Sequence, residues 1–417
     1  MIKICDVIMG GGKSQSAITY MNEHPERRFV YITPFVSETE RIARDCPNLN
    51  FVLPSNKLPQ FNFSKVEHTR WLLKIGANIA TTHVAFRSYT DDMLEYIREH
   101  NYVLIADEAV DVFTEMSCST GDLKVLMDAG CIKQVGDHYE KTDKEYTGVK
   151  LRDLYEAIRC NNLIQVPVGD DGMEYYYWAL PPEALIAFGE VYVLTYLFAS
   201  SEFKYFLDIY GIPYTYIGVS YDNGVYRFSD KPEYTPSYVH SISEKIHVFG
   251  EEKKERDVGR NYHALSSNWF RNHPTQTAVL KNNVYNFLRH KNPHCKGEDI
   301  MWSCFKECKK NLRGDGYSKQ HIEFNAKAKN EYRHKTVLAY CVNIFQKPSR
   351  VRFFKQFGID YDIDGYALST MIQWIWRSAI RDGKPISVYI PSRRMRELLL
   401  DWLSSLSMEV NASETVA

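Results

Sequence analysis

Residues 3–14 read Lys-Ile-Cys-Asp-Val-Ile-Met-Gly-Gly-Gly-Lys-Ser, and a helical run over residues 15–22 follows. A strand that ends in consecutive glycines and opens a helix has the local order of a phosphate-binding loop. A phosphate chain needs backbone N–H groups without Cβ interference, a helix N-terminus, an ammonium group and a hydroxyl for Mg²⁺. These groups are supplied by Gly10, Gly11, Gly12, Lys13 and Ser14. The stretch therefore predicts a nucleotide-binding loop in an α/β domain, with Ser14 as a ligand of Mg²⁺.

Residues 103–110 read Val-Leu-Ile-Ala-Asp-Glu-Ala-Val, an apolar strand that delivers Asp107 and Glu108 at its carboxyl end. Ligands of open α/β sheets bind at that end of the strands. We expect Asp107 to hold Mg²⁺ and Glu108 to orient and deprotonate the water that attacks the γ-phosphate. Each motif alone has an ordinary alternative, namely a glycine-rich turn with a surface lysine, and a strand terminus or helix cap. Their occurrence in one chain favours the catalytic interpretation.

The first part of the chain alternates between short β-branched runs and helical stretches. Such alternation, with runs closed by Gly, Ser, Thr or Pro, is typical of βαβ units and a parallel sheet. Strands are predicted at residues 3–8, 29–33, 79–82, 102–106, 191–194 and 214–219. Residues 112–185 lose this rhythm and are predicted to be an insertion, with a tyrosine-rich hairpin at 169–177 that contains an Asp-Gly turn.

A polar, proline-containing stretch at residues 230–243 marks a predicted boundary near residue 240. The predicted domains are therefore 1–240, with the insertion, and 241–417. We expect the second domain to be α/β as well, with a helix at 275–289. Its strands are predicted at residues 245–249, 300–303, 321–325 and 386–390.

Composition excludes several classes of protein. Of the 417 residues, 44% are hydrophobic and 25% are charged, which excludes a disordered or collagen-like chain. The 51 Lys and Arg residues balance 52 Asp and Glu residues, which argues against a general histone-like coating of DNA and leaves local grooves for nucleic acid. The nine cysteines are scattered, so we expect a reducing cytoplasm and no disulfides.

The sequence predicts neither export nor membrane insertion. The N-terminus lacks a basic head followed by a long apolar segment, so no signal peptide is expected. The most apolar stretch, residues 184–200, is short for a spanning helix and contains Glu190. A cytoplasmic protein without a membrane partner is expected.

With both motifs in place, the chain resembles the superfamily 2 helicases of the DEAD/DEAH type, and more narrowly the helicase-like proteins of bacteriophages. The resemblance extends in order through residues 31–35 (Tyr-Ile-Thr-Pro-Phe), 81–83 (Thr-Thr-His), 193–197 (Val-Leu-Thr-Tyr-Leu), 301–303 (Met-Trp-Ser), 324–332 and 373–381. It implies an α/β fold of two RecA-like P-loop NTPase domains with parallel sheets and an insertion in the first. It also implies ATP and Mg²⁺ as cofactors, bound in a cleft between the domains.

The resemblance further implies roles for these segments. Residues 31–35 and 81–83 look like nucleic-acid-contacting motifs, and residues 193–197 look like the motif that couples hydrolysis to domain movement. In such folds, backbone N–H groups, hydroxyls and helix N-termini hold a single strand across the tops of the sheets. The candidate nucleic-acid-binding residues are Thr33, Thr82, His83, Ser303 and Asn325.

Residues 373–381 resemble the arginine-finger motif. Gln373, Arg377 and Arg381 are spaced i, i+4 and i+8, so they would share one face of a helix. An arginine on that face would stabilise the charge that develops on the transferring γ-phosphoryl group when the second domain closes. By spacing alone, a solvated basic edge flanked by Trp374 and Trp376 in the core explains the pattern equally well.

The function implied by the resemblance is an ATP-dependent nucleic-acid helicase or translocase, a nucleotide-binding hydrolase of the host cytoplasm if a phage encodes it. DNA, single-stranded or forked, is the expected partner in phage replication or recombination, with RNA as a second option and replication proteins as further partners. Two alternatives are a catalytically weak DNA-binding or replisome adaptor and a packaging-type motor ATPase. The intact Lys13, Asp107 and Glu108 favour an enzyme over an adaptor.

Two other clusters allow more than one interpretation. Cys304 and Cys308, with His294 and Cys295 nearby, are closer to ordinary buried thiols than to a zinc site, because a complete second ligand pair is not apparent. The run Arg393-Arg394-Met395-Arg396 adds positive potential beside a strand end or simply begins a solvated helix.

Overall fold

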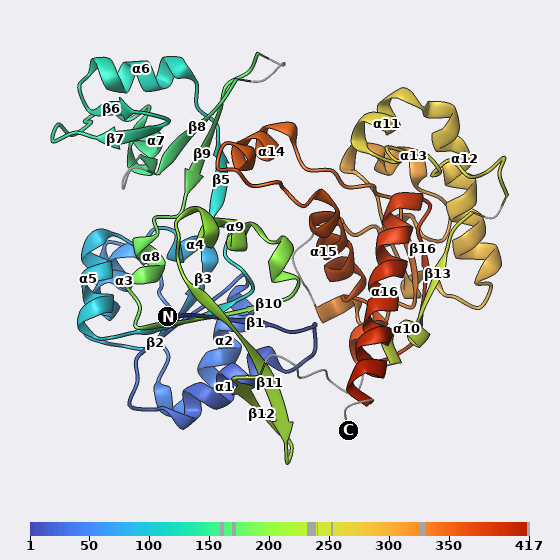
Figure 1. Cartoon of the computed structure of the whole chain (residues 1–417), viewed down its shortest axis with the longest axis horizontal. Helices are drawn as coiled ribbons and strands as arrows, with labels where there is room; N and C mark the ends of the chain where they lie inside the picture. Colours follow the sequence, from blue (N-terminus) through green and yellow to red (C-terminus); the bar gives the residue numbers. More distant parts are fainter. Residues whose placement is uncertain are drawn as a thin grey trace. The chain divides into compact units, whose positions relative to one another are not determined.

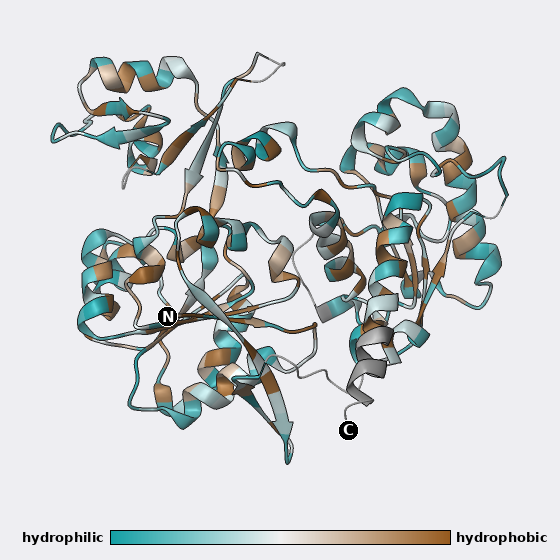
Figure 2. Ribbon diagram, in the orientation of Figure 1, coloured by the Kyte–Doolittle hydropathy of each residue, from teal (hydrophilic) through white to brown (hydrophobic). Residues whose placement is uncertain are grey.

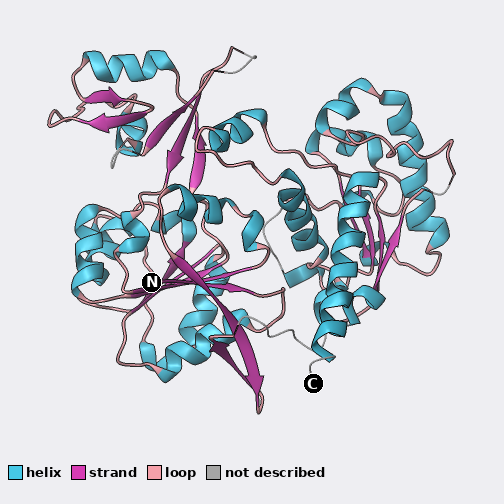
Figure 3. Cartoon of the chain, in the orientation of Figure 1, coloured by secondary structure: helices cyan, strands magenta, loops and turns pink. Residues whose placement is uncertain are grey.

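The structure is a computed structural model that describes residues 1–158, 162–168, 172–231, 239, 241–251, 253–325 and 330–414. The chain forms two compact units. Unit 1 comprises Met1–Tyr234 and Lys347–Tyr361, and unit 2 comprises Thr235–Gln346 and Asp362–Ala417. Each unit has strands at its centre and helices around them (Figure 3). The chain of unit 2 thus contains a segment, 347–361, that belongs to unit 1.

Unit 1 is built on a seven-stranded sheet of order β12-β11-β1-β10-β4-β2-β3, in which only β12 is antiparallel to its neighbour. Its strands are β1 (Ile2–Asp6), β2 (Phe29–Thr33), β3 (Ile79–Thr82), β4 (Val103–Asp107), β10 (Glu190–Thr195), β11 (Tyr214–Asp222) and β12 (Val225–Ser229). Every residue of β2 is buried, as expected of a parallel strand with both faces covered. The predicted strands of the first domain are therefore present, although the first one ends at Asp6 rather than at residue 8.

Most helices of unit 1 follow its strands and cover the sheet, whereas the one in the segment 347–361 lies beside the insertion (Figure 1). The helices are α1 (Lys13–Glu23), α2 (Val36–Asp45), α3 (Lys65–Lys74), α4 (His83–Phe86), α5 (Asp91–Glu99), α8 (Glu183–Ile186), α9 (Glu202–Ile209) and α14 (Pro348–Lys355), with short 3₁₀ turns at Pro47–Leu49, Pro59–Phe61 and Phe198–Ser200. Side-chain caps begin several of them. Ser64 accepts a hydrogen bond from the Glu67 N–H at the start of α3, and Ser201 accepts one from the Lys204 N–H at the start of α9.

The insertion is a separate antiparallel sheet of order β5-β9-β8-β7-β6. Its elements are β5 (Phe113–Met116), α6 (Thr120–Asp128), β6 (Ile132–Val135), β7 (His138–Lys141), α7 (Arg152–Ala157), β8 (Leu163–Val166) and β9 (Tyr175–Ala179). A capping box at Ser119 and Asp122 begins α6, and residues such as Leu123, Tyr139 and Tyr176 form its own hydrophobic cluster. The predicted insertion is confirmed. Strands β8 and β9 pair as the expected hairpin, whose Asp-Gly turn falls partly on residues 169–171, outside the described residues.

Unit 2 has a four-stranded parallel sheet of order β13-β16-β15-β14. The strands are β13 (Ile246–Phe249), β14 (Ile300–Ser303), β15 (Val337–Tyr340) and β16 (Ile386–Tyr389). The helices are α10 (Ile242–Lys245), α11 (Ser267–Asn272), α12 (Pro274–Tyr285), α13 (Lys309–Leu312), α15 (Ile363–Ile375) and α16 (Arg393–Glu414), with a π-helical turn at Asn286–Lys291 and 3₁₀ turns at Gly297–Asp299, Lys306–Cys308, Ser318–Gln320, Asn330–Tyr332 and Ala379–Asp382.

Two predictions for unit 2 are wrong in detail. Residues 321–325 are not a strand: along the outer side of the edge strand β14 they form only one isolated bridge, between Trp302 and His321. The helix predicted at 275–289 ends as an α-helix at Tyr285 and continues as the π-helical turn. Strand β15 is short and was not recognised in the sequence.

Helix α14 packs into unit 1 through aromatic side chains. The Phe113 ring of β5 lies 5.0 Å from the Phe353 ring and 5.2 Å from the Phe354 ring, measured between centroids. Phe354 also contacts Tyr205 of α9, with centroids 5.2 Å apart. The segment that returns from unit 2 therefore joins the root of the insertion to α9.

Hydrophobic residues concentrate on the central strands and on the helix faces that cover them (Figure 2). Within the described part of the chain, helices with the length and apolar character needed to cross a bilayer are not found. Eight cysteines lie in the described residues, and each is a free thiol. Cys304 and Cys308 are buried in the core of unit 2, and the described residues contain no group of three metal-ligating side chains.

Candidate nucleotide-binding site

The predicted phosphate loop connects β1 to α1 at the carboxyl edge of the unit 1 sheet. Gly10 has a φ of 80° and Gly12 a φ of 85°, which is the left-handed region that favours glycine. Helix α1 begins at Lys13 directly after Gly12, which has no side chain with which to cap the helix. The first N–H groups of this eleven-residue helix therefore point into the loop, as an anion site requires.

Lys13 lies inside the loop. Its Nζ donates hydrogen bonds to the backbone carbonyls of Val7 and, at 3.2 Å, of Ile8. Burial lowers the pKa of Lys13, and the nearby Cys5, Asp107, Asp6 and Glu108 oppose that shift. The ammonium group is thus held at the loop, near the two carboxylates that the sequence assigned to catalysis.

Ser14 and Asp107 converge although they are far apart in the chain. The Ser14 Oγ lies 3.3 Å from each carboxylate oxygen of Asp107, at the end of β4. Tyr31 of β2 donates a hydrogen bond from its hydroxyl to Asp107 Oδ2 at 2.8 Å. Burial raises the pKa of Asp107, while the Tyr31 hydrogen bond and the charge of Lys13 lower it. A hydroxyl and a carboxylate at one point are the hard oxygen donors that Mg²⁺ takes, so these residues fit the predicted metal site.

Glu108 follows Asp107 with an unusual backbone. Its φ is 69°, in the left-handed region, and its N–H donates to the carbonyl of Leu194 at 3.0 Å. The side chain is exposed beyond the carboxyl edge of the sheet. Such a conformation is costly for a non-glycine residue and, outside turns, tends to cluster at active sites.

The segment predicted to couple hydrolysis to movement lies between the two motifs. Strand β10 pairs with β1 on one side and with β4 on the other, with Thr195 opposite Asp6 and Leu194 opposite Asp107. After β10, the N–H of Phe198 donates to Asp6 Oδ2 at 3.1 Å. Burial raises the pKa of Asp6, and the backbone hydrogen bond from Phe198 opposes this. Asp6 therefore ties the phosphate-loop strand to residues 193–197.

Three residues of this site were missed in the sequence. Asp6 could have been noticed as a carboxylate at a strand end before the glycines. The contacts of Tyr31 with Asp107 and of Tyr226 with Gly12 carry no local signal, because they join strands that are distant in the chain. A Cβ on Gly12 would lie 2.2 Å from Cδ1 of Tyr226, so that ring covers the loop.

The nucleic-acid candidates of unit 1 lie side by side. Thr33 ends β2 and Thr82 ends β3, and the two are register partners. The Thr33 side chain is buried, whereas Thr82 is half-buried and caps α4, accepting a hydrogen bond from the Ala85 N–H at 3.4 Å. His83, the first residue of α4, is buried. Of the three side chains, that of Thr82 is the most accessible.

The two nucleic-acid-binding candidates of unit 2 differ in their exposure to solvent. Ser303 ends β14 and is fully buried, whereas Asn325 is exposed. Residues 326–329, within the segment 324–332 of the helicase resemblance, lie outside the described residues. The structure thus leaves Asn325 as the surface candidate of this pair.

The expectation that Gln373, Arg377 and Arg381 share one helical face is wrong. Helix α15 ends at Ile375, because the chain turns there and a 3₁₀ turn begins at Ala379. Gln373 and Arg381 are exposed, but Arg377 is buried, with Nε 3.4 Å from the Gln373 carbonyl. As the alternative interpretation expected, Trp374 and Trp376 are buried.

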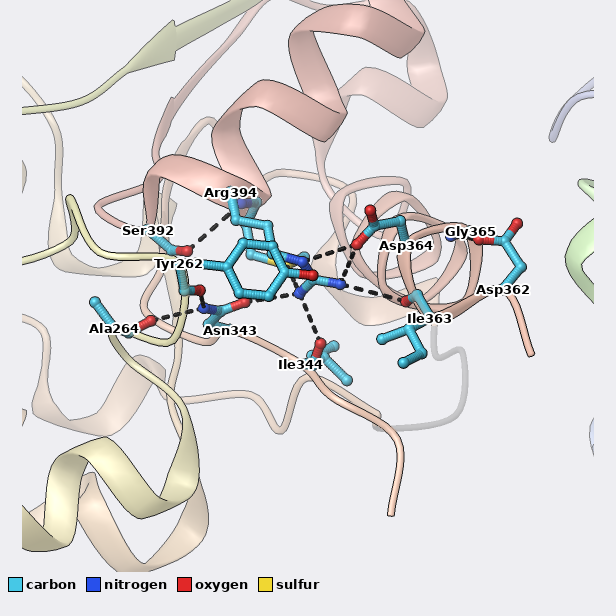
Figure 4. Close-up of polar contacts among 11 residues, drawn as sticks. Tyr262, Ala264, Asn343, Ile344, Asp362, Ile363, Asp364, Gly365, Ser392 and Arg394 are labelled. Atoms are coloured by element: carbon cyan, nitrogen blue, oxygen red, sulfur yellow. Dashed lines mark hydrogen bonds and ion pairs between the residues drawn. The ribbon is translucent and has the colours of Figure 1, made fainter. Parts of the chain in front are cut away.

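Arg394 is a buried structural residue rather than a source of surface potential (Figure 4). Its guanidinium donates to Asp364 Oδ1 (from Nε at 2.8 Å), to Asn343 Oδ1 at 2.8 Å and to the Ile344 carbonyl at 2.9 Å. Asn343 in turn donates to the carbonyls of Tyr262 and Ala264 at 2.8 and 2.7 Å. The network joins the segments that follow β15 and β16 to the start of α15. Of the predicted basic run, Arg393 is the exposed arginine.

Comparisons with known proteins agree with this architecture. Residues 240–403 match the family described as the YonV C-terminal Rossmann-like domain. The SPbeta prophage-derived uncharacterized protein YonV of Bacillus subtilis (strain 168) is 35% identical over 414 residues, which cover 97% of this chain and 99% of that protein.

A solved structure titled XPD helicase superposes with a TM-score of 0.51 at 12% identity, covering 96% of this chain and 94% of that chain. At this identity the likeness concerns the fold, which is helicase-like. The predicted α/β fold of two RecA-like domains with parallel sheets is confirmed.

Proposed function

This chain belongs to the same family as the prophage protein YonV, and we propose that it is an ATP-dependent nucleic-acid helicase or translocase of the superfamily 2 DEAD/DEAH type. The observation that carries the proposal is the convergence of Ser14 and Asp107 beside the open N-terminus of α1, with Glu108 next to them. A glycine-rich turn with a surface lysine would not bring a hydroxyl from a helix and a carboxylate from a distant strand to one point.

In the proposed reaction, the N–H groups of Gly10–Lys13 and the start of α1 bind the phosphates of ATP, and Lys13 neutralises their charge. Ser14 and Asp107 would hold Mg²⁺, which stabilises negative charge on the transferring phosphoryl group. Glu108 accepts the proton of the attacking water. Its side chain is exposed directly after the carboxyl end of β4, so water reaches it.

Coupling to movement is proposed to run through β10. This strand lies between β1 and β4, so a change at either motif reaches it through direct pairing. Asp6 holds the N–H of Phe198 at 3.1 Å and so fixes the start of the segment that leads into α9. Helix α9 contacts α14, the segment that connects to unit 2 at both ends.

The proposed substrate is a single strand of DNA, alone or at a fork. The candidate contacts in unit 1 are Thr82 and the backbone at the carboxyl ends of β2 and β3, and the candidate contact in unit 2 is Asn325. Contacts of this kind use N–H groups and hydroxyls rather than positively charged side chains, so this mode of DNA binding is compatible with a net charge of -1. The prophage origin of the relative supports a role in phage replication or recombination.

The test is steady-state ATP hydrolysis by the purified protein, alone and with single-stranded DNA, duplex DNA, forked DNA and RNA. We expect one nucleic acid to stimulate hydrolysis, and Lys13→Ala to abolish it. Glu108→Gln should lower the rate by at least about 100-fold while ATP binding, measured by calorimetry, persists. If the unaltered protein is folded and binds DNA but hydrolyses ATP no faster than Lys13→Ala on every substrate, the result would instead favour an adaptor.

A further inference from the structure

The β11–β12 hairpin extends beyond the sheet next to the phosphate loop (Figure 1). Strand β1 pairs with β11 from Ile2 opposite Tyr214 to Cys5 opposite Ile217. Strand β11 continues to Asp222 before the chain returns as β12, so its last residues run past the point where β1 ends and the glycines begin. The hairpin therefore flanks the loop on the side of β1 opposite to β10.

The hairpin is preorganised. The turn residues Asn223 and Gly224 have φ values of 50° and 83°, and positive values at both central residues are the mark of a type I′ turn. This turn matches the twist of the paired strands, which are in register from Gly218 opposite Ser229 to Asp222 opposite Val225. The tip therefore has a defined position without help from a ligand.

The hairpin directs two aromatic rings toward the loop. Tyr221 and Tyr226 are register partners, with ring centroids 4.5 Å apart at 40°. Tyr221 shares its strand face with Ile217 and Val219, which are buried in the core that α1 covers. The Tyr226 ring lies over Gly12, and Tyr221 remains 51% exposed. An exposed ring thus stands beside the start of the phosphate-binding helix.

The order of the strands sets the direction of a bound nucleotide. Asp107 lies on β4, which is separated from β1 by β10, whereas β11 lies on the other side of β1. If Ser14 and Asp107 hold the metal of a bound triphosphate, its terminal phosphates would lie on the β4 side. The sugar and base would then lie toward β11 and β12, where Tyr221 and Tyr226 are.

We propose that Tyr221 and Tyr226 form a stacking site for the nucleotide base, which makes the protein purine-selective without making it adenine-specific. The inference rests on the proposed nucleotide-binding function. A phenol ring recognises the π-surface of a base and not its hydrogen-bonding edge, so it favours the larger purines and does not separate adenine from guanine. Selectivity would thus come from the hairpin rather than from the phosphate loop.

Calorimetric titration of the full chain with ATP, GTP, CTP, UTP and inorganic tripolyphosphate, each with Mg²⁺, tests the proposal. We expect ATP and GTP to bind with similar affinity and about 10-fold more tightly than CTP and UTP. Tyr221→Ala should remove this difference and leave tripolyphosphate binding unchanged, while Tyr221→Phe retains it. In hydrolysis, Tyr221→Ala should raise KM for ATP and GTP about 10-fold without lowering kcat, because stacking contributes equally to the ground state and the transition state.

Tyr216→Ala is the matched control, since Tyr216 is a 42% exposed tyrosine on the other face of the same strand. The proposal is overturned if Tyr221→Ala leaves the affinity for ATP unchanged. It is also overturned if Tyr221→Ala weakens the binding of tripolyphosphate as much as the binding of ATP, which would indicate a structural role. In both cases the proposed nucleotide site itself is retained if the unaltered protein binds tripolyphosphate and Lys13→Ala abolishes that binding. Failure of the unaltered protein to bind tripolyphosphate and all four nucleotides would refute the site and the stacking proposal together.

Discussion

Arg350 of α14 forms an ion pair with Glu202 of α9, its Nε donating to Oε1 at 2.9 Å. The two side chains are 13% and 23% exposed. Arg350 Nη2 also donates to the Phe113 carbonyl at 3.0 Å, and its guanidinium lies 4.8 Å from the Tyr177 ring centroid. One side chain thus connects the returning segment, the root of the insertion and the helix after the coupling strand.

Removal of Arg350 should destabilise unit 1. Arg350→Ala leaves the Glu202 carboxylate partly buried without its guanidinium, which we expect to cost about 3 kcal/mol of the free energy of unfolding. Urea denaturation followed by circular dichroism measures this. Lys355→Ala, an exposed residue of the same helix, should change stability by less than about 0.5 kcal/mol. Equal stabilities of the two variants would show that the ion pair does not hold α14 in place.

Gly12→Ala should disturb the phosphate loop for two separable reasons. The new residue would need a φ of 85°, and its Cβ would lie 2.2 Å from Tyr226. We expect a loss of about 2–3 kcal/mol in stability together with loss of ATP binding. Gly136→Ala is the control for backbone strain alone, because Gly136 has a φ of 62° with nothing within 4 Å of an added Cβ. If the two variants lose the same stability, crowding by Tyr226 is not a factor.

The two arginines after α15 should behave differently. Arg381 is exposed, and we propose it as the arginine that stabilises the transferring phosphoryl group. Arg381→Ala should lower kcat of nucleic-acid-stimulated hydrolysis by about 1,000-fold and change the thermal midpoint less than Arg377→Ala does. Arg377→Ala should lower the thermal midpoint, because Arg377 is buried in unit 2. A normal kcat in Arg381→Ala would exclude that residue from the reaction.

Stability should depend on pH through Glu190. Burial raises the pKa of this carboxyl, but hydrogen bonds from Lys3, Arg27 and Tyr192 outweigh it and lower the pKa to about 2 from its ordinary value of 4.5. Because the folded-state pKa is depressed, the stabilisation is complete above about pH 4.5 and is lost as the pH falls toward 2.

The matched variant is Glu190→Gln, measured by urea denaturation at several pH values. Its deficit relative to the unaltered protein should be constant above about pH 5 and should shrink between pH 4.5 and 2. A deficit that does not change with pH would mean that the charge of Glu190 contributes nothing.

Local patterns were sufficient for most of the parallel strands, the phosphate loop, the insertion and the pair Asp107 and Glu108. The signal for each lies within a few neighbouring residues, because burial on both faces requires an apolar run and a phosphate requires glycines before a helix. Elsewhere in unit 2 prediction failed. Strand β15 was missed although it is as long as β13, β14 and β16, and α15 stops at Ile375 although the spacing of Gln373, Arg377 and Arg381 fits a longer helix.

By itself the sequence determined most of the strands and helices and which residues could bind phosphate and metal. Only the tertiary structure decided that Ser14 meets Asp107, that Arg394 is buried with Asn343 and Asp364, and that Tyr226 covers Gly12 with the Tyr221 ring against it. It also decided that residues 347–361 return to unit 1. The reason is physical: local preference acts between neighbours in the chain, whereas strand order and register bring together residues that the sequence separates by tens or hundreds of positions.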